Sequence, residues 1–185
     1  MRSTNTVYVT TEDEYGKHKD RLKEVPCPNC HAVGCLIRHG YLRGYGEGAS
    51  ETVQRGWRVF CSNRGRKQGC GRTYAIFLAC HLYRRLVDAG RLWKFLDGIL
   101  AGKNIKEAWE AVASPFGLET GYKLWDSFAF NQSAIRVRLH SVVIPMKSAL
   151  NPLLQTIAHL RAAFPHASCP ISSFQQLFQR SFLAR

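Results

Sequence analysis

Two absences narrow the class of this protein at the outset. The sequence contains no apolar run of the roughly 18 residues or more that a membrane-spanning helix needs. Its first residues, 1–6, lack the apolar core of a secretion signal. We therefore expect a cytoplasmic protein without a membrane-spanning helix.

Acidic residues are also scarce. The chain has 13 Asp and Glu against 26 Lys and Arg, a net charge of +13, and no acid follows Asp126. Two-metal phosphoryl transfer needs several carboxylates in one site, but the acids from Asp88 to Asp126 fall in segments with helical spacing. The glycines at 44, 46 and 48 precede no helix, so they are no phosphate-binding loop. We predict no enzyme, and the positive charge favours a polyanion as partner, nucleic acid before an anionic membrane surface.

Cysteine is the informative residue type that is present. Four of the seven cysteines form two pairs, Cys27/Cys30 on a Pro/Asn turn and Cys61/Cys70 beside glycines. Two such pairs brought together make the tetrahedral S4 site of a structural zinc ion. An odd cysteine count and no secretion signal disfavour disulfides. The eight residues between Cys61 and Cys70 leave two alternatives open: His31 or His39 in place of Cys61, or four unrelated buried cysteines.

Composition divides the chain into four segments. Residues 1–24 are polar and electrically neutral, and we predict an N-terminal arm. Residues 25–80 carry eight basic and two acidic side chains and have strand-like patterning. Residues 81–147 change to helical spacing, and residues 148–185 form a C-terminal helical tail with no acid.

The expected fold class is α+β, with a small zinc-ribbon β domain followed by an all-α helix-turn-helix bundle. Strands are expected over residues 35–42, 52–60 and 73–77. Helices are expected over residues 91–100, 105–113, 118–130, 150–164 and 172–183.

The helices at 105–113 and 118–130 flank a Ser-Pro-Phe-Gly turn, which is the helix-turn-helix pattern. The second helix is expected to bury Leu118, Tyr122, Trp125 and either Ala129 or Phe128. Residues of the right type to read base edges lie off that stripe: they are Thr120, Lys123, Ser127 and Asn131, and Arg136 and Arg138 are expected to contact the DNA backbone.

Residues 25–80 resemble the N-terminal zinc ribbon of bacterial insertion-sequence transposases. The shared features occur in order: the Cys27–Cys30 knuckle, Arg-His-Gly at 38–40, and Cys-Gly-Arg-Thr-Tyr at 70–74. The following helical pair is similar to the DNA-binding part of such proteins. The resemblance implies that Cys27, Cys30, Cys61 and Cys70 bind Zn²⁺ and that the module docks on DNA, although the widened second knuckle departs from the family's pattern.

We therefore predict a non-catalytic, zinc-dependent protein that binds double-stranded DNA, as a transposon accessory factor, a regulator or a truncated transposase. The alternative is a zinc-ribbon adaptor for RNA or a protein partner. A homodimer, or a separate transposase subunit as partner, fits the paired ends of a transposon. The candidates for phosphate contact in the zinc-binding segment are Arg55, Arg58, Arg64, Arg66, Lys67 and Arg72.

Overall fold

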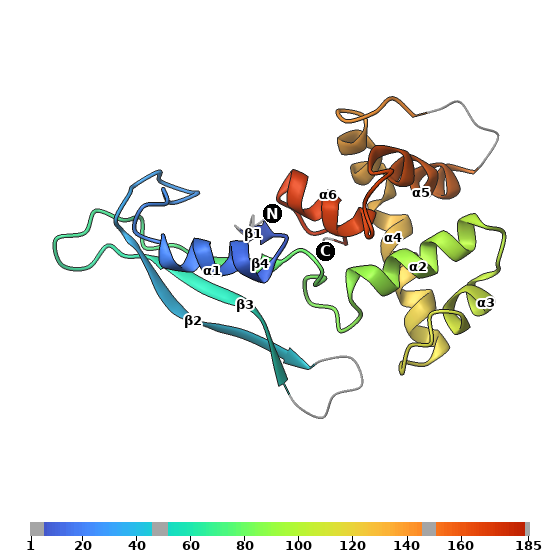
Figure 1. The fold of residues 1–185 in the computed structure, drawn as a ribbon, viewed down its shortest axis with the longest axis horizontal. Coiled ribbons are helices and arrows are strands. Elements are labelled where there is room, and N and C mark those ends of the chain that lie inside the picture. Colours follow the sequence, from blue (N-terminus) through green and yellow to red (C-terminus); the bar gives the residue numbers. More distant parts are fainter. Residues whose placement is uncertain (1–5, 46–51, 146–150, 184–185) are drawn as a thin grey trace. The chain divides into compact units, whose positions relative to one another are not determined.

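The computed structural model describes residues 6–45, 52–145 and 151–183. Within these ranges the chain is mixed α and β, with a four-stranded sheet and six helices. It divides into two compact units, Met1–Ala79 (unit 1) and Cys80–Arg185 (unit 2). Unit 1 contains the strands and the first helix, and unit 2 contains the other five described helices (Figure 1).

The sheet of unit 1 has the strand order β1-β4-β3-β2. The antiparallel part consists of β2 (Leu36–Tyr45), β3 (Thr52–Cys61) and β4 (Thr73–Leu78). These strands cover the three segments that the sequence pattern predicts. β3 lies between two neighbours, and its Gly56 packs so closely on β4 that an added Cβ would lie 2.2 Å from the Ile76 carbonyl oxygen.

Residues 6–20 form structure where the sequence predicted a polar arm. β1 (Thr6–Val9) pairs in parallel with β4, and α1 (Glu12–Asp20) follows, with the Thr11 side chain accepting a hydrogen bond from the Glu14 N–H at its N-terminus. Tyr8 and Val9 are buried. A strand of four residues in a polar segment has too few positions to show a period, and its partner lies far along the chain.

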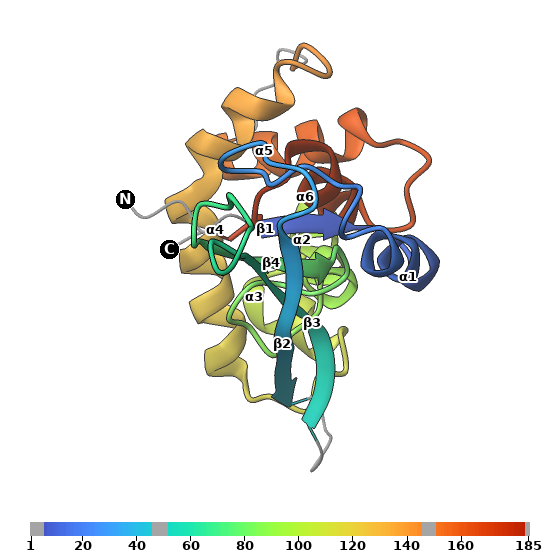
Figure 2. The same cartoon turned by 90° about the vertical axis from the view of Figure 1, so that its left-hand side faces the viewer.

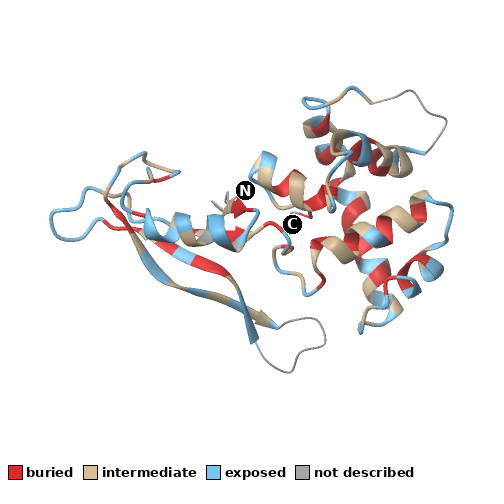
Figure 3. Cartoon of the chain, in the orientation of Figure 1, coloured by how far each residue is buried: buried red, intermediate tan, exposed pale blue. Residues whose placement is uncertain are grey.

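β2 and β3 continue as a two-stranded hairpin beyond the rest of the sheet. β4 pairs with β3 over residues 56–60, whereas β2 and β3 pair with each other out to Tyr45 and Thr52. We call residues 41–45 and 52–57 the outer hairpin. At its inner end Tyr41 and Leu42 pair with Trp57 and Gly56, which also pair with β4, and residues 43–45 and 52–54 run past β4. Figure 2 shows the two strands running away from β4 and α1, and Figure 3 shows that the buried part of β3 lies beside α1.

Unit 2 is built around one apolar core, which includes Phe95, Trp109, Phe128, Leu160 and Phe174. The helices are α2 (Ala89–Leu100), α3 (Ile105–Glu110), α4 (Leu118–Leu139), α5 (Pro152–Ala163) and α6 (Pro170–Phe178). The tail predicted as a separate segment thus contributes α5 and α6 to the same core as α2 to α4. Among the described residues, no helix combines the length and apolar character that crossing a membrane requires.

The buried face of α4 differs from the predicted one. Tyr122, expected in the core, is 47% exposed, and the helix instead buries Gly121 and Leu124. Phe128, one of the two alternatives expected next along the helix, is buried. The ring of Trp109 on α3 explains the rotation, because it packs directly on Gly121, where a Cβ would lie 2.9 Å from it. A glycine has no side chain and so adds nothing to a hydrophobic pattern. The buried stripe predicted for α4 is therefore shifted by about one position from the observed one.

Candidate metal centre

The four paired cysteines converge in unit 1. Four Sγ atoms all lie within 4.8 Å of one another: those of Cys27, Cys30, Cys61 and Cys70. The Sγ atoms are 3.9 Å apart for Cys27 and Cys70, and 3.7 Å apart for Cys30 and Cys61. A disulfide would bring two sulfurs to about 2.05 Å, whereas four sulfurs at about 2.3 Å from one zinc ion lie about 3.8 Å apart. The donor set and its spacing fit a zinc ion.

The first knuckle is held by backbone hydrogen bonds around Cys27. The Cys27 N–H donates to the Ala32 carbonyl (3.0 Å), and the His31 N–H donates to the Cys27 carbonyl (2.9 Å). The Asn29 N–H points at the Cys27 sulfur (3.4 Å). His31 has a left-handed backbone, φ 58°, which turns the chain after Cys30.

The second knuckle repeats this pattern around Cys61. The Cys61 N–H donates to the Arg72 carbonyl (2.8 Å), and the Gly71 N–H donates to the Cys61 carbonyl (2.9 Å). The Cys70 N–H points at the Cys61 sulfur (3.3 Å), and Gly71 has φ 70°. The two knuckles therefore share one backbone frame although the second has six more residues between its cysteines.

The extra residues leave the frame intact because they are closed at their base. We call residues 62–69 the basic loop. Its last residue, Gly69, donates to the carbonyl of its first, Ser62 (3.0 Å), and the Ser62 N–H donates to the Cys35 carbonyl (2.8 Å). A Cβ on Gly69 would lie 2.2 Å from the Ser62 oxygen and 2.7 Å from the Cys61 sulfur. Only a glycine fits between the loop closure and the ligand.

The two cysteines of the second knuckle differ electrostatically. Burial raises the pKa of Cys61 to about 12. At Cys70 burial acts in the same direction, but hydrogen bonds from the Arg72 backbone and the Asn29 side chain outweigh it and lower the pKa to about 7. Donors aimed at sulfur favour the thiolate, which is the form that ligates a metal.

The histidine alternatives do not fit the structure. His31 and His39 are exposed, and the ring of His39 lies against Phe60 with centroids 5.6 Å apart. The group of described residues that could hold a metal ion consists of the four cysteines. Cys61, whose place in this group the wide spacing had left open, is therefore one of its members.

The basic residues predicted in unit 1 fall into two groups. Arg72 donates to the Asn29 Oδ1 (2.6 Å), which ties the second knuckle to the first, and Arg55 donates to the Tyr45 carbonyl (2.9 Å). The others lie exposed, on β3 or on the basic loop: they are Arg58, Arg64, Arg66 and Lys67. The second group is exposed to a partner, and Arg72, which is exposed as well, is held by its hydrogen bond to Asn29.

Two of the residues predicted to read bases are in the core of unit 2. Ser127 is 4% exposed and accepts a hydrogen bond from Arg85 (2.9 Å), and Asn131 is 8% exposed and donates to the Ser127 carbonyl (2.7 Å). Neither side chain can reach a base edge. The sequence pattern predicted that both lie outside the apolar stripe of α4. They are buried because the observed buried face of the helix differs from the predicted one.

The other four candidates of unit 2 are at least partly accessible. Lys123 is exposed and pairs with Glu119 (3.5 Å), and Thr120 is half-buried. Arg136 is half-buried, and Arg138 donates to the Ala134 carbonyl (2.9 Å). Burial, and then the charge of Arg180, lower the pKa of Arg138.

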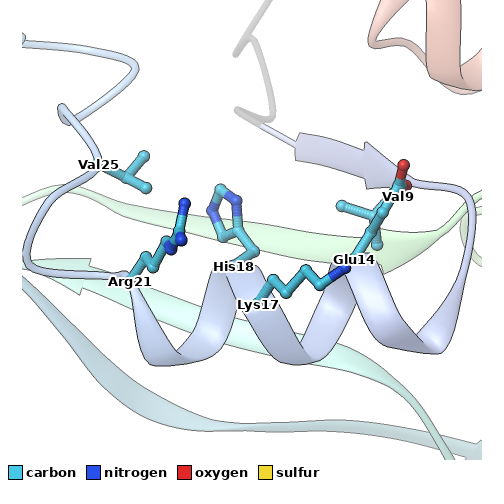
Figure 4. Close-up of a pocket in the computed structure, with 6 residues that line it drawn as sticks. All are labelled: Val9, Glu14, Lys17, His18, Arg21 and Val25. Carbon is cyan, nitrogen blue, oxygen red and sulfur yellow. The ribbon is translucent and has the colours of Figure 1, made fainter.

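A shallow pocket of about 320 Å³ lies along α1 (Figure 4). Lys17, His18 and Arg21 line it from the helix, between Val9 and Val25. Glu14, at one end, accepts a hydrogen bond from the Thr10 N–H (2.8 Å). The pocket therefore adds basic side chains to the surface of unit 1.

Sequence reasoning missed two exposed tyrosines on β2. Tyr41 and Tyr45 are 47% and 56% exposed. Their signal was the alternation of Tyr41, Arg43 and Tyr45, which places three exposed side chains on one face of a strand.

No family model, curated protein or solved structure matches this chain. The likeness to transposases therefore stays a prediction, and the argument for function depends on the site itself.

Proposed function

We propose that this chain is a non-catalytic protein that binds Zn²⁺ through Cys27, Cys30, Cys61 and Cys70 and binds double-stranded DNA through unit 1. In this proposal unit 1 is a zinc ribbon extended by β1 and α1. The observation that carries it is the position of the basic loop, whose two ends are the metal ligands Cys61 and Cys70.

The metal half of the proposal is supported by the donor set and the knuckle frame. Sulfur ligands at tetrahedral spacing are typical of structural zinc, and such sites contribute folding free energy directly. Cys27 and Cys61 are themselves part of the buried core of unit 1. Binding a metal there would hold both knuckles, and therefore the basic loop, in one conformation.

The DNA half is supported by charge. Arg64, Arg66 and Lys67 lie exposed on the basic loop, which contains no acid, and Arg58 lies exposed on β3. Phosphate contacts from such side chains give affinity that is insensitive to sequence and sensitive to salt. A loop fixed at both ends by a metal site loses less conformational entropy on binding than an unconstrained one.

Unit 2 has a supporting part in the proposal. α3, the turn at residues 111–117 and α4 form a helix-turn-helix arrangement, in which Thr120 and Lys123 lie in the first two turns of α4. Arg136 and Arg138 would then contact phosphates. Base reading by Ser127 and Asn131 is not part of it.

The test measures zinc content and duplex affinity at two salt concentrations. We expect about one zinc per chain, lost together with duplex affinity in the Cys27→Ser/Cys30→Ser variant. The variant Arg64→Gln/Arg66→Gln/Lys67→Gln should keep its zinc. The slope of its log affinity against log salt concentration should be smaller in magnitude by about 2 to 3, since each lost phosphate contact contributes about 0.9 to that slope.

The matched control removes the same charge from unit 2. Lys94, Lys103 and Lys106 are exposed, and replacing all three with Gln should leave the salt dependence nearly unchanged. Equal effects of the two triple variants would mean that net charge alone drives binding and would refute a role for the basic loop. Displacement of the duplex by structured RNA at lower concentration would favour the RNA adaptor instead.

A further inference from the structure

The outer hairpin presents aromatic and basic side chains in alternation. Tyr41, Arg43 and Tyr45 occupy every second position of β2, so they lie on the same face of the strand. All three are exposed, the tyrosines at 47% and 56%. We call these three residues the aromatic strand face.

This face is flanked by further positive charge. The Arg38 guanidinium lies over the Tyr41 ring, 5.6 Å from its centroid. Trp57, which pairs with Tyr41 across the hairpin, has the Lys19 ammonium 5.4 Å over its ring. β2 and β3 together contain four arginines and no acid, so the surroundings of the tyrosines favour an anionic partner.

β2 is an edge strand of the sheet in the described part of unit 1, with β3 as its only neighbour. β4 pairs with β3 at residues 56–60, which includes the partner of Tyr41, and it does not extend as far as the partners of Arg43 and Tyr45. The backbone positions of Tyr41 and Tyr45 are about 13 Å apart along the strand, at about 3.3 Å per residue, with Arg43 between them. Two flat rings with a cation between them suit a chain that alternates flat bases with phosphates.

We propose that the aromatic strand face binds single-stranded DNA, with unpaired bases stacked on Tyr41 and Tyr45 and a phosphate beside Arg43. Duplex DNA keeps its bases stacked on one another and offers these rings no base face, whereas a single strand does. This inference rests on the proposed function and deepens it: the basic loop contacts duplex phosphates at one end of the β2–β3 hairpin, and the aromatic strand face takes an unpaired strand at the other. The preferred ligand is then a duplex with a single-stranded extension.

The test compares three labelled DNAs of equal length: a duplex, an oligothymidine single strand, and a duplex with an oligothymidine extension. The wild-type protein should bind the extended duplex most tightly. The Tyr41→Ala/Tyr45→Ala variant should bind the single strand about a hundredfold more weakly, about tenfold for each lost stacking contact of about 1.4 kcal/mol. Its affinity for the blunt duplex should change less than about twofold.

Three further variants separate stacking from folding. Tyr41→Phe/Tyr45→Phe keeps both rings and should bind the single strand like the wild type. Tyr122→Ala removes an equally exposed tyrosine, 47%, from α4 in unit 2 and should leave binding unchanged. Arg43→Gln should lower single-strand affinity and its salt dependence. Unchanged zinc content in each variant shows that unit 1 is folded.

The outcomes distinguish this inference from the proposed function. Duplex binding that depends on the basic loop, without a preference for the extension and without an effect of the tyrosine pair, overturns the inference and leaves the function standing. Absence of binding to any of the three DNAs overturns both. A loss of single-strand affinity in the Ala pair that the Phe pair restores supports the inference.

Discussion

At the scale of single residues, Gly69 is a position where the cysteine cluster leaves no space for a side chain. It closes the basic loop and packs against a ligand, so a side chain there would collide with the Ser62 carbonyl and the Cys61 sulfur. Distances of 2.2 and 2.7 Å leave no room for a methyl group. The backbone and the ligand would have to move together, because both are held by the same hydrogen bonds.

We predict that Gly69→Ala weakens zinc binding by tenfold or more, roughly the effect of 1–3 kcal/mol of overpacking, measured by competition with a chromophoric chelator. Gly16→Ala is the control, since Gly16 is within α1 and a Cβ there would meet no atom within 4 Å. That variant should keep its zinc affinity and gain up to about 1 kcal/mol of stability from helix propensity. Equal zinc affinities of the two variants would contradict the role assigned to Gly69.

His18 gives unit 1 a dependence on pH. Its Nε2 is buried without a hydrogen-bond partner among the described residues, and burial lowers its pKa. A lowered pKa means that the folded state favours the neutral ring. Stability from this group is present above the unfolded pKa of about 6.5 and is lost as the pH falls below it.

We therefore predict that His18→Gln narrows the difference in Tm of unit 1 between about pH 7.5 and pH 5.5, measured by thermal denaturation with zinc in excess. The neighbours Glu14, Lys17 and Arg21 remain in both proteins, so the comparison isolates the imidazole. His140→Gln, at an exposed position of unit 2, should leave the difference as it is in the wild type. A wider difference in the His18 variant would reverse the sign argued here.

At the scale of elements, the short helix α3 depends on its N-terminal capping box. The Asn104 side chain accepts a hydrogen bond from the Glu107 N–H (2.9 Å), and the Glu107 carboxylate accepts one from the Asn104 N–H (3.2 Å). A helix of six residues has few internal hydrogen bonds, so its ends contribute much of its stability. α3 also positions Trp109, which packs on Gly121 and donates to the Phe116 carbonyl (3.0 Å).

We predict that Asn104→Ala lowers the free energy of unfolding of unit 2 by about 1 kcal/mol, measured by urea denaturation followed at the helical circular dichroism band. Asn104→Asp keeps an acceptor at the cap and should lose little. Neither substitution should change zinc affinity, because Asn104 is in unit 2. A loss of zinc in the Ala variant would show that the stability of unit 2 is coupled to the metal site of unit 1, and would contradict this prediction.

At the scale of the whole molecule, the two units have separate hydrophobic cores. The core of unit 1 contains two of the four clustered cysteines, Cys27 and Cys61, and the other two, Cys30 and Cys70, pack against it. The core of unit 2 consists of side chains from the helices and their connections. Loss of a metal should therefore act on one core and not on the other.

We predict that a strong chelator unfolds unit 1 and leaves unit 2 folded. Thermal denaturation of the chelated protein should lose the transition that belongs to unit 1, while the helical circular dichroism of α2 to α6 is retained. Restoring zinc should restore the transition, and magnesium, which prefers oxygen ligands, should not. Simultaneous loss of both units on chelation would show that their stabilities are coupled.

Sequence patterns located most elements because the signals for them are local. The partial alternation in β3 and the three- and four-residue spacing in α2 can both be seen within a short window. The capping box of α3 is a local signal of the same kind, since Asn104 and Glu107 are three residues apart. β1 was not predicted from the sequence because its stability comes from pairing with β4. The burial of Ser127 was not predicted because the buried face of α4 depends on Trp109 of a neighbouring helix.

By itself, the sequence determined the chemistry of this protein: two pairs of cysteines, the excess of positive charge in the same segment, and the mixed content of strands and helices. The tertiary structure decided which groups act together. Cys61 and Cys70 form a knuckle because backbone hydrogen bonds close the basic loop between them. Tyr41 and Tyr45 lie on β2, the edge strand of the sheet, and Tyr45 lies where β2 and β3 extend past β4. Both results depend on contacts between residues distant in the chain, and no local pattern encodes those.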